Sequence, residues 1–296
     1  MTYNEHLDPE LERVAQELER DARYRVLREV PPRFSRMPDD GVRPEGRCLA
    51  LIDLETSGLD PENDRIIELA VMLVWISDDA QVSNHVGPFV WNEDPGVPLS
   101  PEITMITGLT NEQLSGEKID DRKVLRLLSR ADLLVAHNCR FEIAWLERRY
   151  PSLVGAPWGC SMADIDWLKA GLDGRAQQHL LMQHGWFSRA HRAADDVWSL
   201  FILLQERRQG WEQQERTHLQ RLVENAGRTG ALVEAVRAPY AKKELLRERG
   251  YRWNPSRRVW TKEIEPALLD DEQAWFFRVN LPTPAVTKMT ACERHR

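Results

Sequence analysis

Residues 48–55 read CLALIDLE, and this segment decides which fold the chain adopts. Its apolar run is continuous up to Ile52, which indicates a strand that is buried on both faces. Residues 65–76, RIIELAVMLVWI, form a second run of this kind, and a third strand is expected over residues 85–91. Because alternating strands and helices follow, we predict an α/β fold built on a mixed sheet with flanking helices.

The sequence on either side of these strands predicts the remaining elements. A short strand is expected at residues 133–136. Residues 8–30 have high helix propensity, and a pair of prolines ends this helix. Apolar residues at helical spacing predict further helices over residues 120–131, 141–149, 160–171, 176–184 and 189–209.

The composition limits the class of protein. The chain has 296 residues, of which 42% are hydrophobic and 29% charged, and its net charge is -7. No segment approaches the roughly 18 uncharged apolar residues that a membrane span needs, so no membrane protein is expected. The N-terminus lacks the apolar core of a secretory signal, and the four cysteines show no CxxC spacing. We therefore expect a cytoplasmic protein without a disulfide framework or a cysteine zinc site.

Charge is unevenly distributed along the chain. Residues 237–262 contain nine Lys and Arg against two Asp and Glu, whereas the remainder of the chain is acidic overall. We expect four parts: an N-terminal helix with a linker (1–46), the main α/β domain (47–207), a helical connector (208–236), and a small basic aromatic module with a tail (237–296). A basic segment joined to an acidic body often marks a contact with nucleic acid.

Two carboxylates stand at the end of the first predicted strand. Residues two apart on a strand point to the same face, so Asp53 and Glu55 are expected side by side. Neighbouring carboxylates repel each other unless a cation neutralises them, and Mg²⁺ prefers carboxylate oxygens. The pattern is consistent with a divalent-cation site. A strand that ends in a solvated acidic turn is the other interpretation of this motif taken alone.

Further acids and a histidine fall where helices begin. His191 and Asp196 belong to HRAADD, near the start of the long predicted helix, and Glu142 follows the short strand at 133–136. Taken singly, each acid is also explained as a carboxylate that favours the positive end of a helix dipole. Together with Asp53 and Glu55, they fall at strand ends and helix starts, where open α/β sheets assemble their sites.

Three segments resemble the motifs of one enzyme family. They are similar, in order, to the three motifs of the DEDDh 3′–5′ exonucleases, which include the proofreading epsilon subunit of bacterial replicative polymerase: LIDLETSGLDPENDRIIELA (51–70), AHNCRFEIAWLERRY (136–150) and HRAADDVWSL (191–200). ITGLTNEQL (106–114) is similar to a connecting segment of the epsilon-like branch. The resemblance covers about residues 47–207 and implies a ribonuclease H-like mixed sheet with flanking helices.

The resemblance also implies a mechanism. The family hydrolyses phosphodiester bonds with two metal ions, Mg²⁺ or Mn²⁺, which in this chain would be held by Asp53, Glu55, Glu142 and Asp196. His191 would take the proton from the attacking water, since an imidazole can accept a proton near neutral pH.

Four further residues are candidates for substrate binding by the same resemblance. Thr56 and Leu59 would contact the terminal nucleotide, and His137 and Asn138 would order the loop of the second motif. A satisfied structural pair is the other interpretation of His137 and Asn138. The implied partner is nucleic acid, namely single-stranded or frayed 3′ ends of DNA, and a polymerase or repair protein is a second candidate partner.

Glu142 departs from the family pattern, which has Asp after Phe in the second motif. Glu keeps the charge but adds one methylene group, so we expect activity with an altered metal preference. A catalytically weakened nucleic-acid-binding or polymerase-associated subunit is the alternative. An RNA-trimming enzyme is a further interpretation, because the same constellation cuts both polymers.

The basic segment contains aromatic residues between its Lys and Arg residues. Tyr251, Trp253 and Trp260 flank the turn residues 254–257, which predicts a hairpin. Single-stranded nucleic acid is held by such combinations of stacking surface and positive charge. We expect the two tryptophans to form a small core and the charges to contact nucleic acid.

Overall fold

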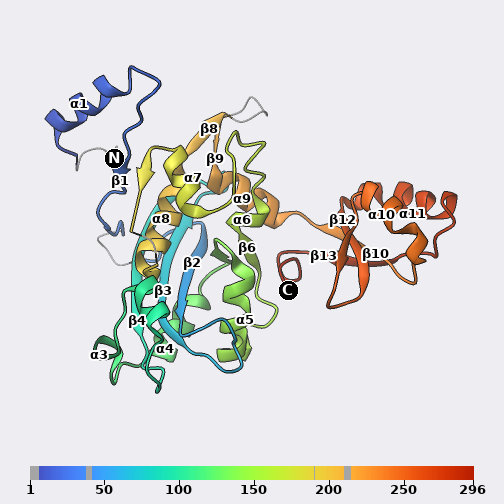
Figure 1. Cartoon of the computed structure of the whole chain (residues 1–296), viewed down its shortest axis with the longest axis horizontal. Helices are drawn as coiled ribbons and strands as arrows, with labels where there is room; N and C mark the ends of the chain where they lie inside the picture. The colour runs from blue at the N-terminus through green and yellow to red at the C-terminus, as the bar shows by residue number, and fades with distance from the viewer. Residues whose placement is uncertain (1–6, 38–41, 190, 210–214) are drawn as a thin grey trace. The chain divides into compact units, whose positions relative to one another are not determined.

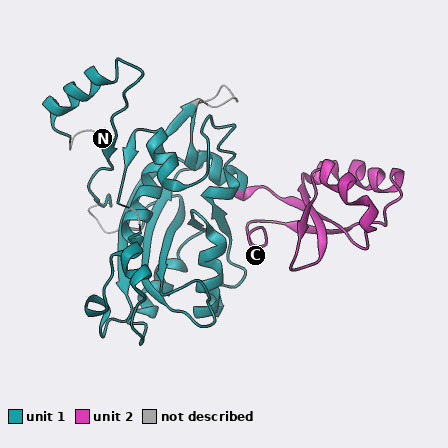
Figure 2. Cartoon of the chain, viewed as in Figure 1, with its two compact units in different colours: residues 1–225 teal, residues 226–296 magenta. Residues whose placement is uncertain are grey.

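The computed structural model describes residues 7–37, 42–189, 191–209 and 215–296. These residues fall into two units, unit 1 (residues 1–225) and unit 2 (residues 226–296), which Figure 2 shows in different colours. Each unit has its own sheet and its own hydrophobic core, so each is described separately. Within the described ranges, no helix combines the length and apolar character that crossing a membrane requires.

A five-stranded mixed sheet is the centre of unit 1 (Figure 1). The three strands on one side of the sheet are antiparallel to one another, and the two strands on the other side are parallel to their neighbours. Every residue of the strand Ile66–Ile76 is buried, because both faces of the sheet are covered. This arrangement confirms the predicted mixed sheet. In spatial order the strands are β4 (Val82–Asn92), β3 (Ile66–Ile76), β2 (Arg47–Thr56), β5 (Leu133–Ala136) and β6 (Trp158–Cys160).

Helices cover both faces of this sheet. Alternate residues of β2, including Ala50 and Ile52, share a core cluster with α4 (Asp121–Leu128) and α5 (Cys139–Arg149). The long, almost fully buried helix α8 (Ala193–Gln205) packs against β2, β3 and β4. Smaller helices complete the unit: α2 (Pro101–Thr107), α3 (Asn111–Leu114), α6 (Ser161–Asp164), α7 (Gln177–Gln183) and α9 (His218–Gly227).

The N-terminal segment forms a short helix and an arm rather than one long helix. α1 (Pro9–Leu18) ends well before residue 30, and β1 (Arg28–Glu29) pairs in parallel with β7 (Trp186–Phe187). Arg28 is the reason, because its guanidinium binds both Glu12 and Glu19 and so folds the chain back on the helix. The arm continues over α8, where the Trp198 indole donates to the carbonyl of Pro31 at 2.7 Å.

Two other predicted helical regions differ from the structure. Over residues 160–171 only the four-residue α6 is helical, because the Asp164 carboxylate accepts from the amide of Cys160 and closes a single turn. The expected helical connector at 208–236 also contains strands: β8 (Arg207–Gln209) pairs with β9 (Glu215–Thr217), and β10 (Gly230–Ala235) follows α9. Part of that connector, residues 210–214, lies outside the described residues.

Unit 2 is a four-stranded antiparallel sheet with two helices. The strand order is β11 (Arg252–Asn254), β12 (Val259–Ile264), β10 and β13 (Ala285–Met289). β11 and β12 form the predicted hairpin, and Val233, Tyr251 and Phe276 pack in the core beneath α10 (Lys243–Glu248) and α11 (Leu269–Arg278). Trp260 packs against this core, but Trp253 is half exposed, so the expectation that both tryptophans are core residues is wrong for Trp253.

Candidate active site

A cavity of about 650 Å³ in unit 1 is lined by residues of β2, α2, α5, α7 and α8. The lining includes the last residues of β2 and residues from the first turns of α5 and α8. All nine residues that the sequence nominates line this one cavity: Asp53, Glu55, Thr56, Leu59, His137, Asn138, Glu142, His191 and Asp196.

Three carboxylates meet in the cavity. Asp53 and Glu55 are two apart on β2, and Asp196 belongs to the first turn of α8, which packs on β2. One oxygen from each carboxylate lies within 4.8 Å of the others. The period-two alternation of the strand therefore presents two acids to the helix that supplies the third.

These carboxylates hold their protons more tightly than free acids do. Burial, followed by the charges of Glu142, Asp196 and Glu55, raises the pKa of Asp53 well above its ordinary value. Burial and the nearby Asp196 raise the pKa of Glu55 to about 8. Burial raises the pKa of Asp196 to about 6, although the His191 amide, which donates to this carboxylate, opposes the rise. Such a cluster is stabilised at neutral pH by a bound cation, which fits a divalent-metal site.

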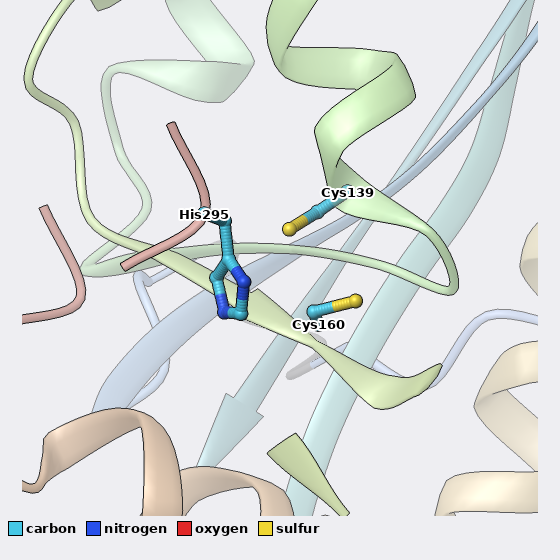
Figure 3. A group of neighbouring side chains, drawn as sticks. All are labelled: Cys139, Cys160 and His295. Carbon is cyan, nitrogen blue, oxygen red and sulfur yellow. The ribbon is translucent and has the colours of Figure 1, made fainter. Parts of the chain in front are cut away.

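Glu142 is on the wall of the same cavity and has an unsatisfied oxygen. The residue is in the first turn of α5 and only 4% exposed, and its Oε2 makes no hydrogen bond to the described residues. Burial and the neighbouring Cys160 raise the pKa of Glu142 to about 8. Cys160 ends β6 and Cys139 begins α5, and both are buried cysteines outside any disulfide among the described residues (Figure 3). No donor among the described residues compensates the Glu142 oxygen, so a cation is a fitting partner for it.

The start of α8 is fixed by two acids. His191 has a positive φ of 66°, and its amide donates to Oδ2 of Asp196 at 2.8 Å. Glu68 on β3 is 1% exposed and accepts from the Ala193 amide and from the Arg192 guanidinium, both at 2.7 Å. His191 is exposed and lines the cavity, and these contacts hold the residues from His191 to the start of α8.

The four candidate substrate-binding residues differ in their exposure and in the hydrogen bonds that their side chains already make. Leu59 is 85% exposed, whereas the Thr56 hydroxyl donates to the carbonyl of Gly58 at 2.5 Å. Both ring nitrogens of His137 have partners, with Nδ1 2.8 Å from the Ser161 hydroxyl and Nε2 2.7 Å from the carbonyl of Arg175. Asn138 is exposed at the start of α5 and makes no capping hydrogen bond with its side chain.

Several cavity residues were not nominated from the sequence. Ile103 and Ile106 of α2 form an apolar wall, and Gln177 of α7 lines the cavity while its side chain donates to the carbonyl of Asp196 at 2.9 Å. A signal for the first two was present, because a Ser-Pro start at residues 100–101 marks a helix with Ile at positions three apart. Nothing local in the sequence marks Gln177.

Known proteins resemble this chain over the region that carries the cavity. The chain is 32% identical over 114 residues to the PolC-type DNA polymerase III of Listeria innocua, and 25% identical over 168 residues to that of Thermotoga petrophila. These matches cover 38% and 52% of this chain but only 8% and 11% of the polymerases, so the chain matches a small part of much longer proteins.

Solved structures and a family model complete the comparison. Exonuclease X in complex with 5′ overhanging duplex DNA is 24% identical, with 51% of this chain and 86% of that chain covered and a TM-score of 0.39. E. coli exonuclease I in complex with a dA16 oligonucleotide is 14% identical, with 80% and 68% covered and a TM-score of 0.44. The family model RNase_T, described as exonuclease, matches residues 50–203, which is just over half of the chain and includes every residue that lines the cavity. The chain therefore belongs to the exonuclease family.

Proposed function

We propose that this protein is a divalent-metal-dependent 3′–5′ exonuclease that hydrolyses the terminal phosphodiester bond of single-stranded or frayed DNA 3′ ends. The observation that carries the proposal is the group of three carboxylates, Asp53, Glu55 and Asp196, within 4.8 Å of one another in a cavity of the family-matched region. Such a site can promote phosphodiester hydrolysis at neutral pH, because cations held by the carboxylates neutralise the charge that accumulates on the phosphate as the bond breaks.

The donor set fits two hard cations such as Mg²⁺ or Mn²⁺. Asp53, Glu55 and Asp196 would hold one cation, and Asp53 with Glu142 would hold the other. Oε2 of Glu142 has no other partner among the described residues. When bound, these ions supply an acidified water and neutralise charge on the phosphate oxygens. The cluster of acids with raised pKa values supports this assignment, since burial and mutual repulsion outweigh the lowering effect of the nearby Arg192 on Glu55.

The surrounding side chains would orient the substrate and move the proton. His191 takes the proton of the attacking water on its exposed ring, within a loop that Asp196 and Glu68 hold in place. The exposed Leu59 packs against the terminal base, and the backbone beside Thr56 receives the terminal sugar. His137 orders the second-motif loop, since both of its ring nitrogens are already bonded within the protein.

The test is nucleotide release from oligomers labelled at the 5′ end. Matched DNA and RNA strands are incubated with Mg²⁺, with Mn²⁺ or with EDTA, and a phosphorothioate at the last 3′ linkage provides the directional control. We expect a metal-dependent ladder that shortens from the 3′ end of DNA and is blocked by the phosphorothioate. Binding without metal-dependent release would instead support a weakened nucleic-acid-binding subunit, and preferred release from RNA would support an RNA-trimming enzyme.

We further propose that the protein acts in a complex with a polymerase or a repair protein. The polymerases that this chain resembles carry the corresponding segment within a much longer chain, and in this chain the segment is followed by unit 2. An exonuclease of this kind acts on the same 3′ ends that a polymerase extends. Co-purification of the tagged full chain with a replicative or repair polymerase is the expected result, and recovery of nucleic acid alone would contradict this part of the proposal.

A further inference from the structure

The topology of unit 2 gathers basic residues at one end of its sheet. Ala235, the last residue of β10, pairs with Trp260, which in turn pairs with Trp253. The β11–β12 turn, with Arg258, therefore lies at the same end of the sheet as Arg237, which follows β10. Arg252 is one position further into the sheet, in the row that contains Glu234.

These cations are available to a ligand. Arg237, Arg252 and Arg258 are exposed, and none of them has a carboxylate partner among the described residues. Arg257 of the same turn is used internally, since its guanidinium binds Glu234 at 3.0 Å. Elsewhere in unit 2, Arg249 binds Glu272 at 3.0 Å, so unpaired charge is not a general property of its surface.

An aromatic surface accompanies the cations. Trp253 is 50% exposed on the edge strand β11, and its ring contacts Trp260 at a centroid distance of 5.8 Å with an interplanar angle of 63°. That contact fixes the indole while half of its surface stays in water. Tyr240, 79% exposed, follows Arg237 after two residues and has the Lys243 ammonium 4.4 Å from its ring. Arg252 and Trp253 are consecutive on β11, so their side chains leave opposite faces of the sheet at its edge. A strand that crosses this edge can stack a base on the indole while the arginines neutralise its phosphates.

We propose that this surface of unit 2, made of Arg237, Arg252, Trp253 and Arg258 and called the basic end, binds single-stranded DNA. Charge complementarity selects the ligand, because a polyanion with exposed bases satisfies both the arginines and the indole. A duplex offers phosphates but keeps its bases stacked, so it can contact the arginines but cannot stack a base on the indole. The inference rests on the proposed function in one respect, namely that the strand bound here belongs to the substrate.

Binding is measured with the full-length chain carrying Asp53→Asn, in EDTA, by fluorescence anisotropy of a labelled mixed-sequence DNA 20-mer over a series of KCl concentrations. Arg252→Gln removes one cation from the edge strand β11. Lys288→Gln is the matched control, because Lys288 is an exposed cation on the opposite edge strand β13 and pairs with Ala231 towards the other end of β10. Both variants lower the net charge equally, so only position distinguishes them.

The two kinds of contact give different signatures. Arg252→Gln is expected to weaken binding several-fold and to reduce the salt slope by about 0.7, the value for one phosphate of a single strand, whereas Lys288→Gln leaves both nearly unchanged. Trp253→Ala is expected to weaken binding about tenfold, roughly the loss of one stacked base, with an unaltered salt slope. Blunt duplex DNA should lose little affinity in Trp253→Ala. Circular dichroism and thermal melting establish that each variant is folded.

Two results would overturn the proposal. Equal losses in Arg252→Gln and Lys288→Gln would mean that only net charge attracts the strand. Unchanged affinity in both Arg252→Gln and the double variant Arg237→Gln/Arg258→Gln would mean that the basic end does not touch DNA. Because the assay contains no metal, its outcome is independent of hydrolysis: an exonuclease whose binding ignores these variants refutes only this inference, and a strand-binding chain without nucleotide release refutes only the proposed function.

Discussion

The cavity of unit 1 and the basic end of unit 2 have opposite chemistry. The cavity of unit 1 concentrates carboxylates whose pKa values are raised by burial and mutual repulsion, whereas the basic end of unit 2 presents solvated, unpaired arginines. A phosphate can approach the arginines directly but can approach the carboxylates only when a cation lies between them. On the two proposals, hydrolysis and strand binding are therefore separable, and removing the metal should separate them.

The largest effect is expected from Asp53→Asn. Loss of a central carboxylate should abolish detectable hydrolysis with Mg²⁺ and Mn²⁺, while metal-free DNA affinity stays the same or rises slightly because a repelling charge is gone. The melting temperature should not fall, since a buried charge is removed without a change of shape. Asp78→Asn, at an exposed position, is the control. Near wild-type turnover in Asp53→Asn would refute the metal assignment.

His191→Ala should slow hydrolysis by about 10²–10⁴-fold, the usual size of a lost general base. Metal affinity should be little changed, because the hydrogen bond from His191 to the carboxylate cluster comes from its backbone amide, which the variant keeps. Fixed-time activity assays across a pH series measure the hydrolysis rate, and isothermal titration calorimetry with Mn²⁺ measures the metal affinity. A collapse of metal affinity with an unaltered shape of the pH–rate profile would assign His191 a different role.

Glu68→Gln tests whether the anchor of the α8 start matters for rate. The amide oxygen can still accept from Ala193, but the ion pair with Arg192 is lost, so kcat should fall about 10- to 100-fold with little change in KM. Glu68→Ala removes both contacts and should be slower still. Glu62→Gln, which alters an exposed pair with Arg148, is the control. Full activity in Glu68→Ala would show that the loop holds His191 without this anchor.

Glu142 should set the choice of metal. Its longer carboxylate should crowd the small, strictly octahedral Mg²⁺ more than the larger Mn²⁺, so the natural protein should be several-fold faster with Mn²⁺. Glu142→Asp should narrow this gap, and Glu142→Ala should be impaired with both ions. If Glu142→Asp is instead the damaging change and the natural protein shows no preference, the start of α5 already compensates for the extra methylene group.

The smallest effect is on stability. The folded-state pKa of Glu55 is raised to about 8, above the roughly 4.3 of an unfolded Glu, so folding favours its protonated form. The metal-free melting temperature should therefore fall by a few degrees as pH rises from about 5 to about 8. Glu55→Gln should show a smaller fall, and saturating Mg²⁺ should flatten the profile. Identical slopes for both proteins without metal would contradict the electrostatic account of the cavity.

Local patterns predicted β2, α5, α7 and α8, which carry most of the cavity, but not α2. Residues 133–136 form β5 as expected, and the alternation on β2 is sufficient to place Asp53 beside Glu55. The ALVEA segment of β10 was expected to be helical because Ala, Leu and Glu favour helices, but pairing with β12 and β13 overrides that propensity. Local sequence patterns cannot predict long-range contacts of this kind. The contact of Glu68 with the residues after His191 is another example.

The N-terminal arm has a practical consequence for how the protein is produced. The family match begins at residue 50, yet Phe34 and the carbonyl of Pro31 cover Trp198, and Arg36 bridges to His85 on β4. A recombinant fragment trimmed to the match would also cut β2 after its third residue and remove the amide of Cys48 that binds Asp132. Expression of the catalytic body should therefore start near residue 25, and a fragment beginning at 50 should be recovered mainly in inclusion bodies.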